Sequence, residues 1–431
     1  MKRVGILMLL LGALFFKVPS NRSFQNACLE SVKRTSTSFF AKPNTTYRIK
    51  KTFDLKGNRI QVAENCRIII DGGKLINGTL VGNNTKIEVK RNRVAFDGIS
   101  FEGSFIMPLI KTDYFNIDRN TLVDMFCLTE ASVDNEVVIN HDLEVSIPKE
   151  WHGVVTVDSN TDILLNANIH LLSSSYKGGN IFYVDNCENV TFSGSGHLIG
   201  DLVEHRGTEG ECIYGIFIAN SSNVTIKEIT CEYFWGDGIY IYPGGITHKR
   251  GQICDNILID NVTCNYNRRQ GISVVGGSNI VIKNSRLENT GVLRGTPPMS
   301  GIDIEPANHY DYQVDNIIIE NCFFKNNGLY SRRPCPQYND IMVVGNNERV
   351  RIVNCSVQCI LFWNSSHIEV DSCSVARVLH TIANNKVHDI TIKNSTIAHV
   401  LSNFRRIKNA SVLNSNIGHV EKEEVFMYKE K

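Results

Sequence analysis

Two acidic side chains in the segment GIDIE, residues 301–305, could perform acid–base chemistry. Asp303 and Glu305 alternate with two isoleucines, and alternate residues of a β-strand share one face and lie about 6.5–7 Å apart. If the isoleucines are buried, both carboxylates face outward, on the wall of a groove. One carboxyl group can then protonate a leaving oxygen while the other activates water or attacks, as cleavage of a glycosidic bond requires. We therefore predict Asp303 and Glu305 as catalytic residues.

Two upstream segments, WGDGIYIY (235–242) and NRRQGIS (267–273), add charged and aromatic side chains. We expect three further catalytic candidates near the acid pair, at or close to strand ends: Asp237, Arg268 and Arg269. Aromatic rings offer flat apolar faces to sugar rings, and polar groups can hydrogen-bond to sugar hydroxyls. The substrate-binding candidates are Trp235, Tyr240, Tyr242 and Asp340.

The exposed face of a sheet also carries solvated charges that have no function, so the acids alone do not establish a site. The unusual segments, however, fall on consecutive repeats, and the longest insertions lie beside them, at about 243–255, 290–300, 306–315 and 327–339. Loops held around one strip of a rigid scaffold are a common place for binding and catalysis. We therefore expect a functional site at this strip.

A repeat positions these residues along the chain. From residue 189 onward a polar opening residue precedes an apolar-x-apolar strand, and successive openers are 34, 33, 23, 37, 33, 18, 22 and 20 residues apart. Each unit alternates with the strand period and is rich in Val, Ile and Thr. One strand cannot bury its apolar side alone, whereas stacked units build a continuous core. The predicted fold is therefore all-β: a right-handed parallel β-helix, with longer steps marking inserted loops.

The register of the repeat makes three expectations testable. One inward stack should contain Ile226, Ile259, Ile282, Ile319, Ile352, Val370 and Ile392. Six residues after three consecutive openers stand Cys322, Cys355 and Cys373, for which we expect buried, reduced thiols rather than a metal or redox site. Asparagine openers such as Asn189 and Asn223 suit turn conformations and can stack as an amide ladder.

The N-terminal part of the chain is less regular. Lys2 and Arg3 precede an apolar run that is too short to span a bilayer and is typical of a signal peptide. Apolar residues at helical spacing between about 119 and 132 predict a short helix that caps the solenoid. The expected organisation is a signal peptide (1–20), a small N-terminal β unit (21–110), a linker with the capping helix (111–145) and the β-helix (146–431).

Composition narrows the class of partner. The chain of 431 residues carries 45 basic and 44 acidic residues, a net charge of +1, whereas nucleic-acid binders show a basic excess on one face. No segment after the signal peptide is apolar enough to cross a membrane. We therefore expect a secreted, periplasmic or cell-surface protein that binds no nucleic acid, and the sequence leaves its oligomeric state open.

The segments GDGI, NRRQGIS and GIDIEP on neighbouring repeats resemble the pectate-lyase-like superfamily of right-handed β-helices. The resemblance covers roughly residues 110–431 and is closest to secreted proteins of gut bacteria and to phage tail spikes. The stretch from Asp71 to Val89 also looks like the leader unit of Bacteroides-type secreted β-helix proteins. The resemblance implies activity on polysaccharides, by hydrolysis, elimination or epimerisation.

No single mechanism in that superfamily carries over residue by residue. Asp237 falls where polygalacturonases place a catalytic aspartate, but Arg269-Gln270 stands in place of their paired aspartates. Met299-Ser300-Gly301 likewise replaces their Gly-His-Gly. Pectate lyases use calcium with an Arg or Lys base, and the two adjacent arginines would suit that chemistry, although no lyase motif matches.

Three functions therefore remain open at the level of sequence. The first is a polysaccharide hydrolase, which we place slightly ahead of the second, a calcium-dependent polysaccharide lyase. Calcium is the one cofactor that either enzyme hypothesis implies, and no metal ligands are assigned. The third is a β-helix that binds glycans without cleaving them, which needs aromatic rings and hydrogen-bond donors but no close carboxylates.

Overall fold

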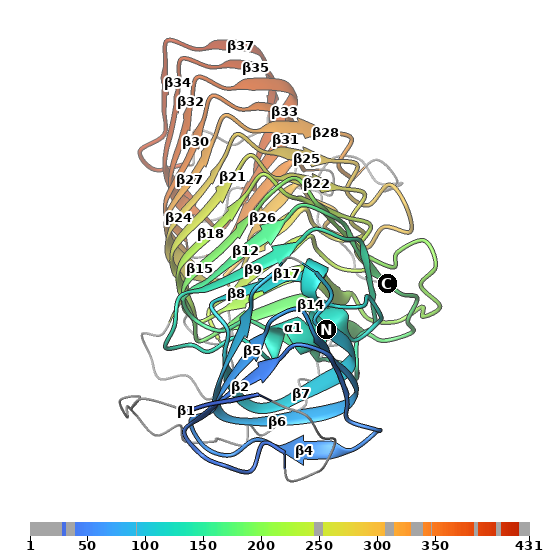
Figure 1. Ribbon diagram of the computed structural model, residues 1–431. Coiled ribbons are helices and arrows are strands. Elements are labelled where there is room, and N and C mark those ends of the chain that lie inside the picture. The colour runs from blue at the N-terminus through green and yellow to red at the C-terminus, as the bar shows by residue number, and fades with distance from the viewer. Residues whose placement is uncertain are drawn as a thin grey trace.

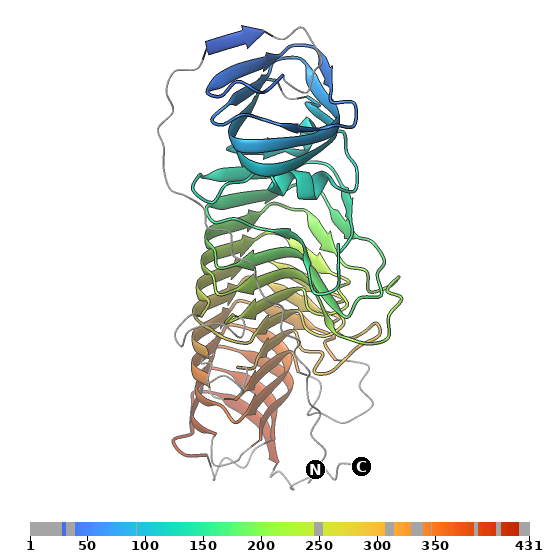
Figure 2. The same cartoon turned by 90° about the horizontal axis from the view of Figure 1, so that it is seen from below.

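The computed structural model describes residues 28–31, 39–91, 93–244, 253–306, 314–328, 339–345, 347–382, 387–401 and 407–421. The chain forms a long parallel β-helix whose rungs follow one another along a single axis, with the N-terminal unit at one end (Figures 1 and 2). The expected signal peptide lies outside the described residues. No helix in the described ranges has the length and apolar character needed to cross a membrane.

Two long parallel sheets form the solenoid. The 12-stranded sheet contains β8 (Leu109–Lys111), β9 (Asn135–Ile139), β12 (Thr161–Leu165), β15 (Glu188–Ser193), β18 (Ser222–Lys227), β21 (Asp255–Asp260), β24 (Gly277–Lys283), β27 (Val314–Glu320), β30 (Asn347–Val353), β32 (Ser366–Asp371), β34 (His388–Lys393) and β36 (Ser411–Leu413). Its strands are the apolar-x-apolar units of the sequence repeat.

The 18-stranded sheet supplies the other walls and carries the strip of candidate residues. It contains β10 (Leu143–Val145), β11 (Gly153–Thr156), β13 (Ile169–Leu171), β14 (Gly178–Asp185), β16 (His197–Ile199), β17 (Cys212–Ala219), β19 (Thr230–Glu232), β20 (Ile239–Tyr242), β22 (Thr263–Asn265), β23 (Ile272–Val274), β25 (Arg286–Glu288), β26 (Ile302–Ile304), β28 (Phe323–Lys325), β29 (Ile341–Val344), β31 (Ser356–Trp363), β33 (Ser374–Ile382), β35 (Thr396–Leu401) and β37 (Asn416–Glu421).

The predicted register is confirmed along the whole inward stack. Ile226 pairs with Ile259, and the column continues rung by rung through Ile282, Ile319, Ile352, Val370 and Ile392. All seven side chains are fully buried. The period of the sequence repeat therefore fixes which side of each strand faces the core.

The cysteine and asparagine expectations are also confirmed. Cys322, Cys355 and Cys373 are buried and unbridged, and each thiol lies 3.3 Å from the carbonyl oxygen two residues earlier. The openers share a left-handed backbone with φ between 53° and 58°, a conformation that asparagine adopts readily. The side-chain amide of Asn223 donates to Asn189, and that of Asn256 donates to Asn223, so the openers form an amide ladder.

The predicted capping helix is present but short, as α1 (Thr121–Phe126), after the 3-10 turn η1 (Thr112–Tyr114). Leu122, Met125 and Phe126 are buried, and the Phe126 ring lies 5.7 Å from that of Phe182 in the first rungs. The helix contacts β7, β10 and β11 and therefore sits where the N-terminal unit meets the solenoid.

The N-terminal unit is a separate seven-stranded parallel sheet of β1 (Cys28–Ser31), β2 (Thr45–Ile49), β3 (Thr52–Asp54), β4 (Arg59–Gln61), β5 (Arg67–Ile70), β6 (Lys74–Val89) and β7 (Phe96–Ile106). One buried apolar cluster runs from Phe40 through this unit to Ile407 near the other end of the solenoid. Strands of the long sheets already begin at β8, upstream of the boundary at residue 146, while the domain boundaries themselves stay a prediction.

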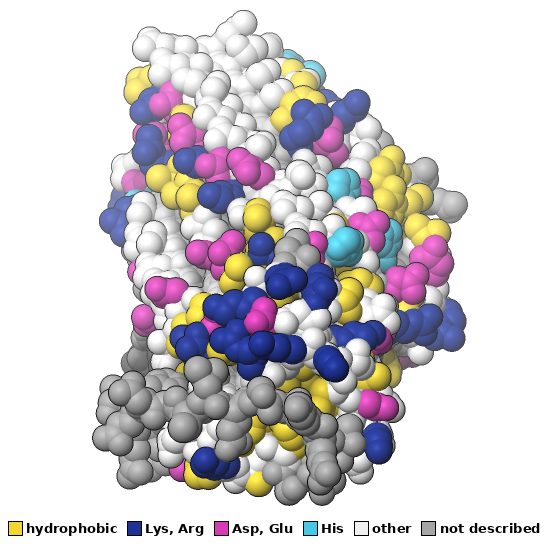
Figure 3. Space-filling model, viewed as in Figure 1, with side chains coloured by type: hydrophobic (Ala, Val, Ile, Leu, Met, Phe, Trp, Pro, Cys, Tyr) yellow, Lys and Arg dark blue, Asp and Glu magenta, His cyan; other side chains and the backbone are white. Residues whose placement is uncertain are grey.

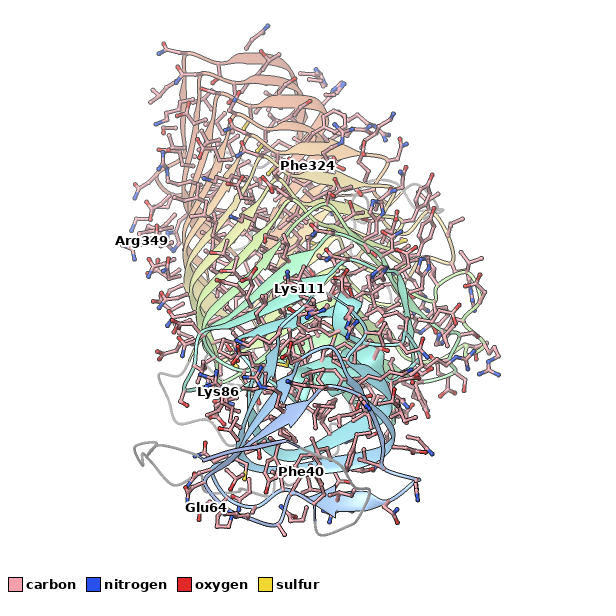
Figure 4. The ribbon with its side chains drawn as sticks, viewed as in Figure 1. Phe40, Glu64, Lys86, Lys111, Phe324 and Arg349 are labelled. Carbon is pink, nitrogen blue, oxygen red and sulfur yellow. The ribbon has the colours of Figure 1, made fainter. Side chains whose placement is uncertain are left out.

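Basic side chains gather in the lower half of Figure 3, around the level at which Figure 4 labels Lys86 and Lys111. In the N-terminal unit many basic groups are matched by acids: Arg48 pairs with Asp71 at 2.8 Å, and Lys74 pairs with Asp97 at 2.9 Å. Part of the positive charge of this unit is therefore neutralised by neighbouring carboxylates.

Candidate functional site

The strip of candidate residues is one outward column of the 18-stranded sheet. In register, Phe217 pairs with Tyr240, Tyr240 with Ser273, Ser273 with Asp303, and Asp303 with Met342. The residues on either side of this column, such as Ile302 and Ile304, are fully buried in the core. The alternation that led to the prediction is therefore observed, and it places polar and aromatic side chains of successive rungs in contact.

Asp303 is on the outward side of β26, as predicted, but it is only 3 % exposed, so neighbouring residues cover its carboxyl group. Its Oδ2 accepts a 2.7 Å hydrogen bond from Nε2 of Gln270, whose Oε1 accepts one from the Ser300 amide. Oδ1 accepts no hydrogen bond from the described part of the chain. Burial raises the pKa of Asp303 well above its ordinary value, and the charge of Glu305 raises it further.

Glu305 follows the last residue of β26 and is half-buried. Its backbone N–H donates to the carbonyl oxygen of Val274 on the preceding rung, which holds the chain against β23. Of the two predicted acids, Glu305 is thus the more accessible to solvent and to a ligand.

Asp237 precedes β20 and is fully buried. Its Oδ2 accepts a hydrogen bond of 2.7 Å from the Ser273 hydroxyl and one of 3.2 Å from Nη1 of Arg269. Burial raises its pKa to about 6, against the opposing effects of the Arg269 charge and the Ser273 hydrogen bond. The neutral and charged forms of Asp237 are therefore both accessible near neutral pH.

The two adjacent arginines have different roles. Arg269 lies between acids: besides Asp237, its Nε is 3.6 Å from a carboxylate oxygen of Glu211, and the charge of Asp303 also acts on it. Burial disfavours the charged form of Arg269, but Asp237, Tyr214, Tyr240 and Asp303 together raise its pKa well above its ordinary value. The Arg269 side chain is 20 % exposed and remains a fixed positive charge beside the strip.

Arg268 turns away from the acids, so its predicted catalytic place beside them is wrong. Its guanidinium lies 3.8 Å from the centroid of the Trp235 ring and donates to the carbonyl oxygens of Arg294 and Gly210, at 2.9 and 2.8 Å. On the Trp235 ring, His205 also stacks at 4.0 Å. Arg268 therefore ties together loops that are far apart in the sequence.

Two predicted substrate-binding residues, Trp235 and Asp340, are buried and bound to other parts of the protein. Trp235 is 2 % exposed and donates its indole N–H to the Gly210 carbonyl oxygen, so its ring is not available to a sugar. Asp340 is also buried and accepts hydrogen bonds from the side chain of Asn327 and the backbone N–H of Cys359. The two predictions were wrong because His205 and Arg268 cover the Trp235 ring, and because both carboxylate oxygens of Asp340 already accept hydrogen bonds within the protein.

The predicted tyrosines do form a half-exposed aromatic surface. Tyr240 stacks on Tyr214 with ring centroids 4.5 Å apart and planes 8° apart, and Tyr242 lies 6.0 Å from Tyr240. Phe217 packs edge-on against Tyr240 at 5.2 Å. Tyr214 and Phe217 were missed by sequence reasoning, although the alternation in the segment 215–219 already places Phe217 on the outward side.

The acids of the strip do not group as metal ligands. Among the described residues, three His, Cys, Asp or Glu ligand atoms come within 4.8 Å of one another at His367, His388 and Asp389, on the other sheet. A hollow of about 460 Å³ also lies away from the strip, lined among others by His170, Glu204 and Tyr233, beside β13 and β16.

Comparison with known protein families identifies the same fold as the structure. Residues 214–416 match the family described as "Right handed beta helix region". The chain is 28 % identical over 294 residues to the uncharacterized protein YclG of Bacillus subtilis (strain 168), a match that covers 64 % of this chain and 50 % of that protein. The chain thus spans about half the length of this curated relative. The resemblance to pectate-lyase-like right-handed β-helices is confirmed as to fold.

Two solved structures match this chain at low sequence identity and low TM-score. The tailspike protein gp49 of Acinetobacter baumannii bacteriophage Fri1, a capsular polysaccharide depolymerase, is 15 % identical, with a TM-score of 0.38 over 66 % of this chain and 50 % of that chain. The A-module of the mannuronan C-5 epimerase AlgE4 of Azotobacter vinelandii is 13 % identical, with a TM-score of 0.44 over 71 % and 93 %. Fold alone does not determine activity, so function must be argued from the site.

Proposed function

Because this chain is a right-handed parallel β-helix with a polar strip on one wall, we propose that it is a secreted enzyme that hydrolyses glycosidic bonds in a polysaccharide. The observation that supports the proposal is the contrast between Asp303 and Glu305 on one rung. A buried carboxyl group with a raised pKa stands beside a more accessible one, and two such groups with different environments are the usual acid and base of glycoside hydrolysis.

In this proposal Asp303 holds its proton at neutral pH and donates it to the leaving oxygen, because burial and the charge of Glu305 both favour its neutral form. Glu305 then activates water or attacks the anomeric carbon. Tyr240 and Tyr242 supply ring surfaces for the neighbouring sugars, and Arg269 supplies a positive charge that favours an acidic sugar.

Hydrolysis is favoured over elimination by the state of the arginines. A lyase needs a basic side chain that can accept a proton, yet the surrounding acids hold Arg269 protonated, and Arg268 is committed to carbonyl oxygens and Trp235. Calcium takes six to eight oxygen ligands, whereas Asp237 is already paired with Arg269 and one oxygen of Asp303 with Gln270. The donors that remain suit a calcium site poorly.

Cleavage is also favoured over binding alone. Burying a carboxyl group without satisfying both oxygens is costly, typically about 1–3 kcal/mol, and Asp303 Oδ1 is left in that state. A surface that only binds glycans has no need of such a group, whereas perturbed buried acids are concentrated at catalytic sites.

The test is product analysis of the purified protein against plant, host and microbial polysaccharides. We expect new reducing ends without an unsaturated, ultraviolet-absorbing product, and we expect Glu305→Gln to lower turnover by about 10²–10⁴-fold. Glu320→Gln, at a half-buried acid on the 12-stranded sheet, is the matched control and should retain activity.

Asp303→Asn should lower turnover to a similar extent, but Asp303 is buried, so its melting temperature must be measured beside its activity. Glu305→Gln changes a more accessible side chain and is the more decisive variant. Wild-type turnover in both variants would place the catalytic residues elsewhere, and an unsaturated product would replace the hydrolase by a lyase.

A further inference from the structure

Three side chains with nitrogen and oxygen ligand atoms converge at the start of β32 and β34. Oδ2 of Asp389 lies 3.3 Å from Nε2 of His367 and 2.7 Å from Nδ1 of His388. All three ligand atoms lie within 4.8 Å of one another, and the side chains are between 31 % and 48 % exposed. The cluster is therefore open to ions in solution.

The cluster interrupts the amide ladder of the openers. Earlier in the solenoid, amide follows amide: Asn223 donates to Asn189, Asn256 to Asn223, and Asn316 to Asn279. His367 and Asp389 occupy the same opener position with the same left-handed backbone, and the ladder resumes when Asn409 donates to Asp389. An asparagine would serve the backbone at both positions, so the turn alone does not explain this exchange of ligand-type residues.

The rung before His367 shows another way of ending the amide ladder. Arg349 stands at that opener, at the outer edge of the solenoid in Figure 4, and forms an ion pair with Asp315. A positive side chain thus faces a carboxylate there. The next two openers are His367 and Asp389. The carboxylate of Asp389 is paired with the imidazoles of His367 and His388 rather than with a permanently charged side chain.

The outer atoms of two of these ligands are already held by neighbours. Nδ1 of His367 is 3.2 Å from the Ser366 hydroxyl, which leaves Nε2 free to carry its lone pair toward the cluster. Oδ1 of Asp389 accepts a 2.6 Å hydrogen bond from the Asn409 amide, which leaves Oδ2 facing the imidazoles. Partners of this kind orient the ligands of metal sites and fix the tautomer of the histidine.

We propose that His367, His388 and Asp389 bind a divalent transition-metal ion of the zinc class, which clamps β32 to β34. Two imidazoles and a carboxylate suit zinc, whereas calcium and magnesium prefer oxygen alone. Zinc bonds of about 2.0–2.1 Å in tetrahedral geometry separate neighbouring ligand atoms by about 3.3 Å. The pair with His367 already has this separation at 3.3 Å, and the pair with His388, at 2.7 Å, must open by about 0.6 Å. Water or a ligand fills the fourth position.

The test is zinc titration of the full chain after removal of metals by a chelator, followed by calorimetry and by the melting temperature. We expect one tight site whose occupation raises the melting temperature. The double variant His367→Asn and Asp389→Asn restores the amides of the ladder but removes two ligands. Loss of a single supporting partner already costs about 10–100-fold in affinity, so we expect binding to weaken by about 100-fold or more.

His399→Asn is the matched control, because the His399 and His419 rings lie 5.9 Å apart on β35 and β37. This variant should bind zinc as the wild type does. Cobalt in place of zinc should give the visible absorption of a tetrahedral site in the wild type and in the control, but not in the double variant. Unchanged zinc affinity in a folded double variant, or no tight binding by the wild type, would overturn the proposal.

Discussion

The amide ladder and the strip of candidate residues are two columns of the same solenoid, and their polar groups are satisfied in different ways. Along the ladder, an asparagine gives its amide to the rung before and accepts from the rung after, as Asn189 and Asn223 do. Along the strip, Asp237, Arg269 and Asp303 differ from rung to rung, and Asp303 keeps an oxygen that no described residue satisfies.

The difference shows that identical residues on successive rungs stabilise the solenoid, whereas chemically reactive groups need residues that differ from rung to rung. A repeated side chain meets its own kind in the next rung and is satisfied by that neighbour, so the column is stable and chemically inert. A column in which each rung differs cannot satisfy all of its groups, and burial then shifts the pKa values of Asp237 and Asp303. The predictions below separate these two situations.

The largest effect on stability should come from removing the positive charge of the strip. Arg269→Ala leaves Asp237 and Asp303 buried without a cation, and breaking one partner of a buried ion pair typically costs about 3–5 kcal/mol. Chemical denaturation should show this loss of unfolding free energy, and a separate assay should show loss of activity. Arg286→Ala, at the exposed pair with Glu288, should cost less than about 1 kcal/mol. An equal cost for the two variants would mean that the strip is no more coupled than a surface ion pair.

A second effect should depend on pH. The carboxyl of Asp237 has a pKa of about 6 in the folded protein, compared with about 3.9 in an unfolded chain. Between pH 4 and 6 the folded state therefore holds more protons, and this group's contribution to stability is lost as the pH rises. Asp237→Asn cannot ionise, so its stability relative to wild type should rise over that range by up to about 3 kcal/mol.

Unfolding free energies of wild type and Asp237→Asn at pH 4, 5, 6 and 7 would measure this difference. The variant also loses an ion pair, which shifts its stability at every pH at which Asp237 is ionised, so the change with pH rather than the absolute value is the observable. A difference that stays constant from pH 4 to 7 would show that Asp237 titrates at its ordinary value.

The smallest effect should be found on the ladder. Asn256→Ala loses the amide hydrogen bond. It also places alanine, which tolerates left-handed backbone less well than asparagine does, at this position, at a cost of about 1–2 kcal/mol. Asn256→Gly loses the same hydrogen bond but adopts that backbone freely. Thermal or chemical unfolding should therefore rank wild type above Gly and Gly above Ala. If the two variants were equally stable, the backbone conformation would contribute nothing to the choice of asparagine.

The sequence was sufficient to predict the elements that repeat. The inward stack from Ile226 to Ile392, the thiol of Cys355 and the ladder position of Asn189 all follow from spacing and period, because each rung copies its neighbours. The outward side of Asp303 followed from the same alternation.

The sequence did not predict what covers a side chain once it points outward. Trp235 is buried by contacts to Gly210 and His205, and half-buried Arg268 donates to the Gly210 carbonyl oxygen. These contacts arise from loops whose path no repeat determines. The cluster at His388 was missed for a different reason. Openers are interpreted from the sequence only as turn residues, although a histidine and an aspartate stand at two successive openers, His367 and Asp389, with His388 directly before the second.

The parallel stacking also determines how the molecule opens. A rung in the middle of the solenoid is paired on both sides, whereas a rung at either end of the described sheets is paired on one, so β37 can leave at about half the cost of β26. Backbone amides should therefore exchange with deuterium fastest at the ends and slowest near the centre, in a gradient along the axis rather than in one cooperative block. The rungs that carry Asp237, Ser273 and Asp303 lie in the interior of this gradient, far from the fraying end at β37.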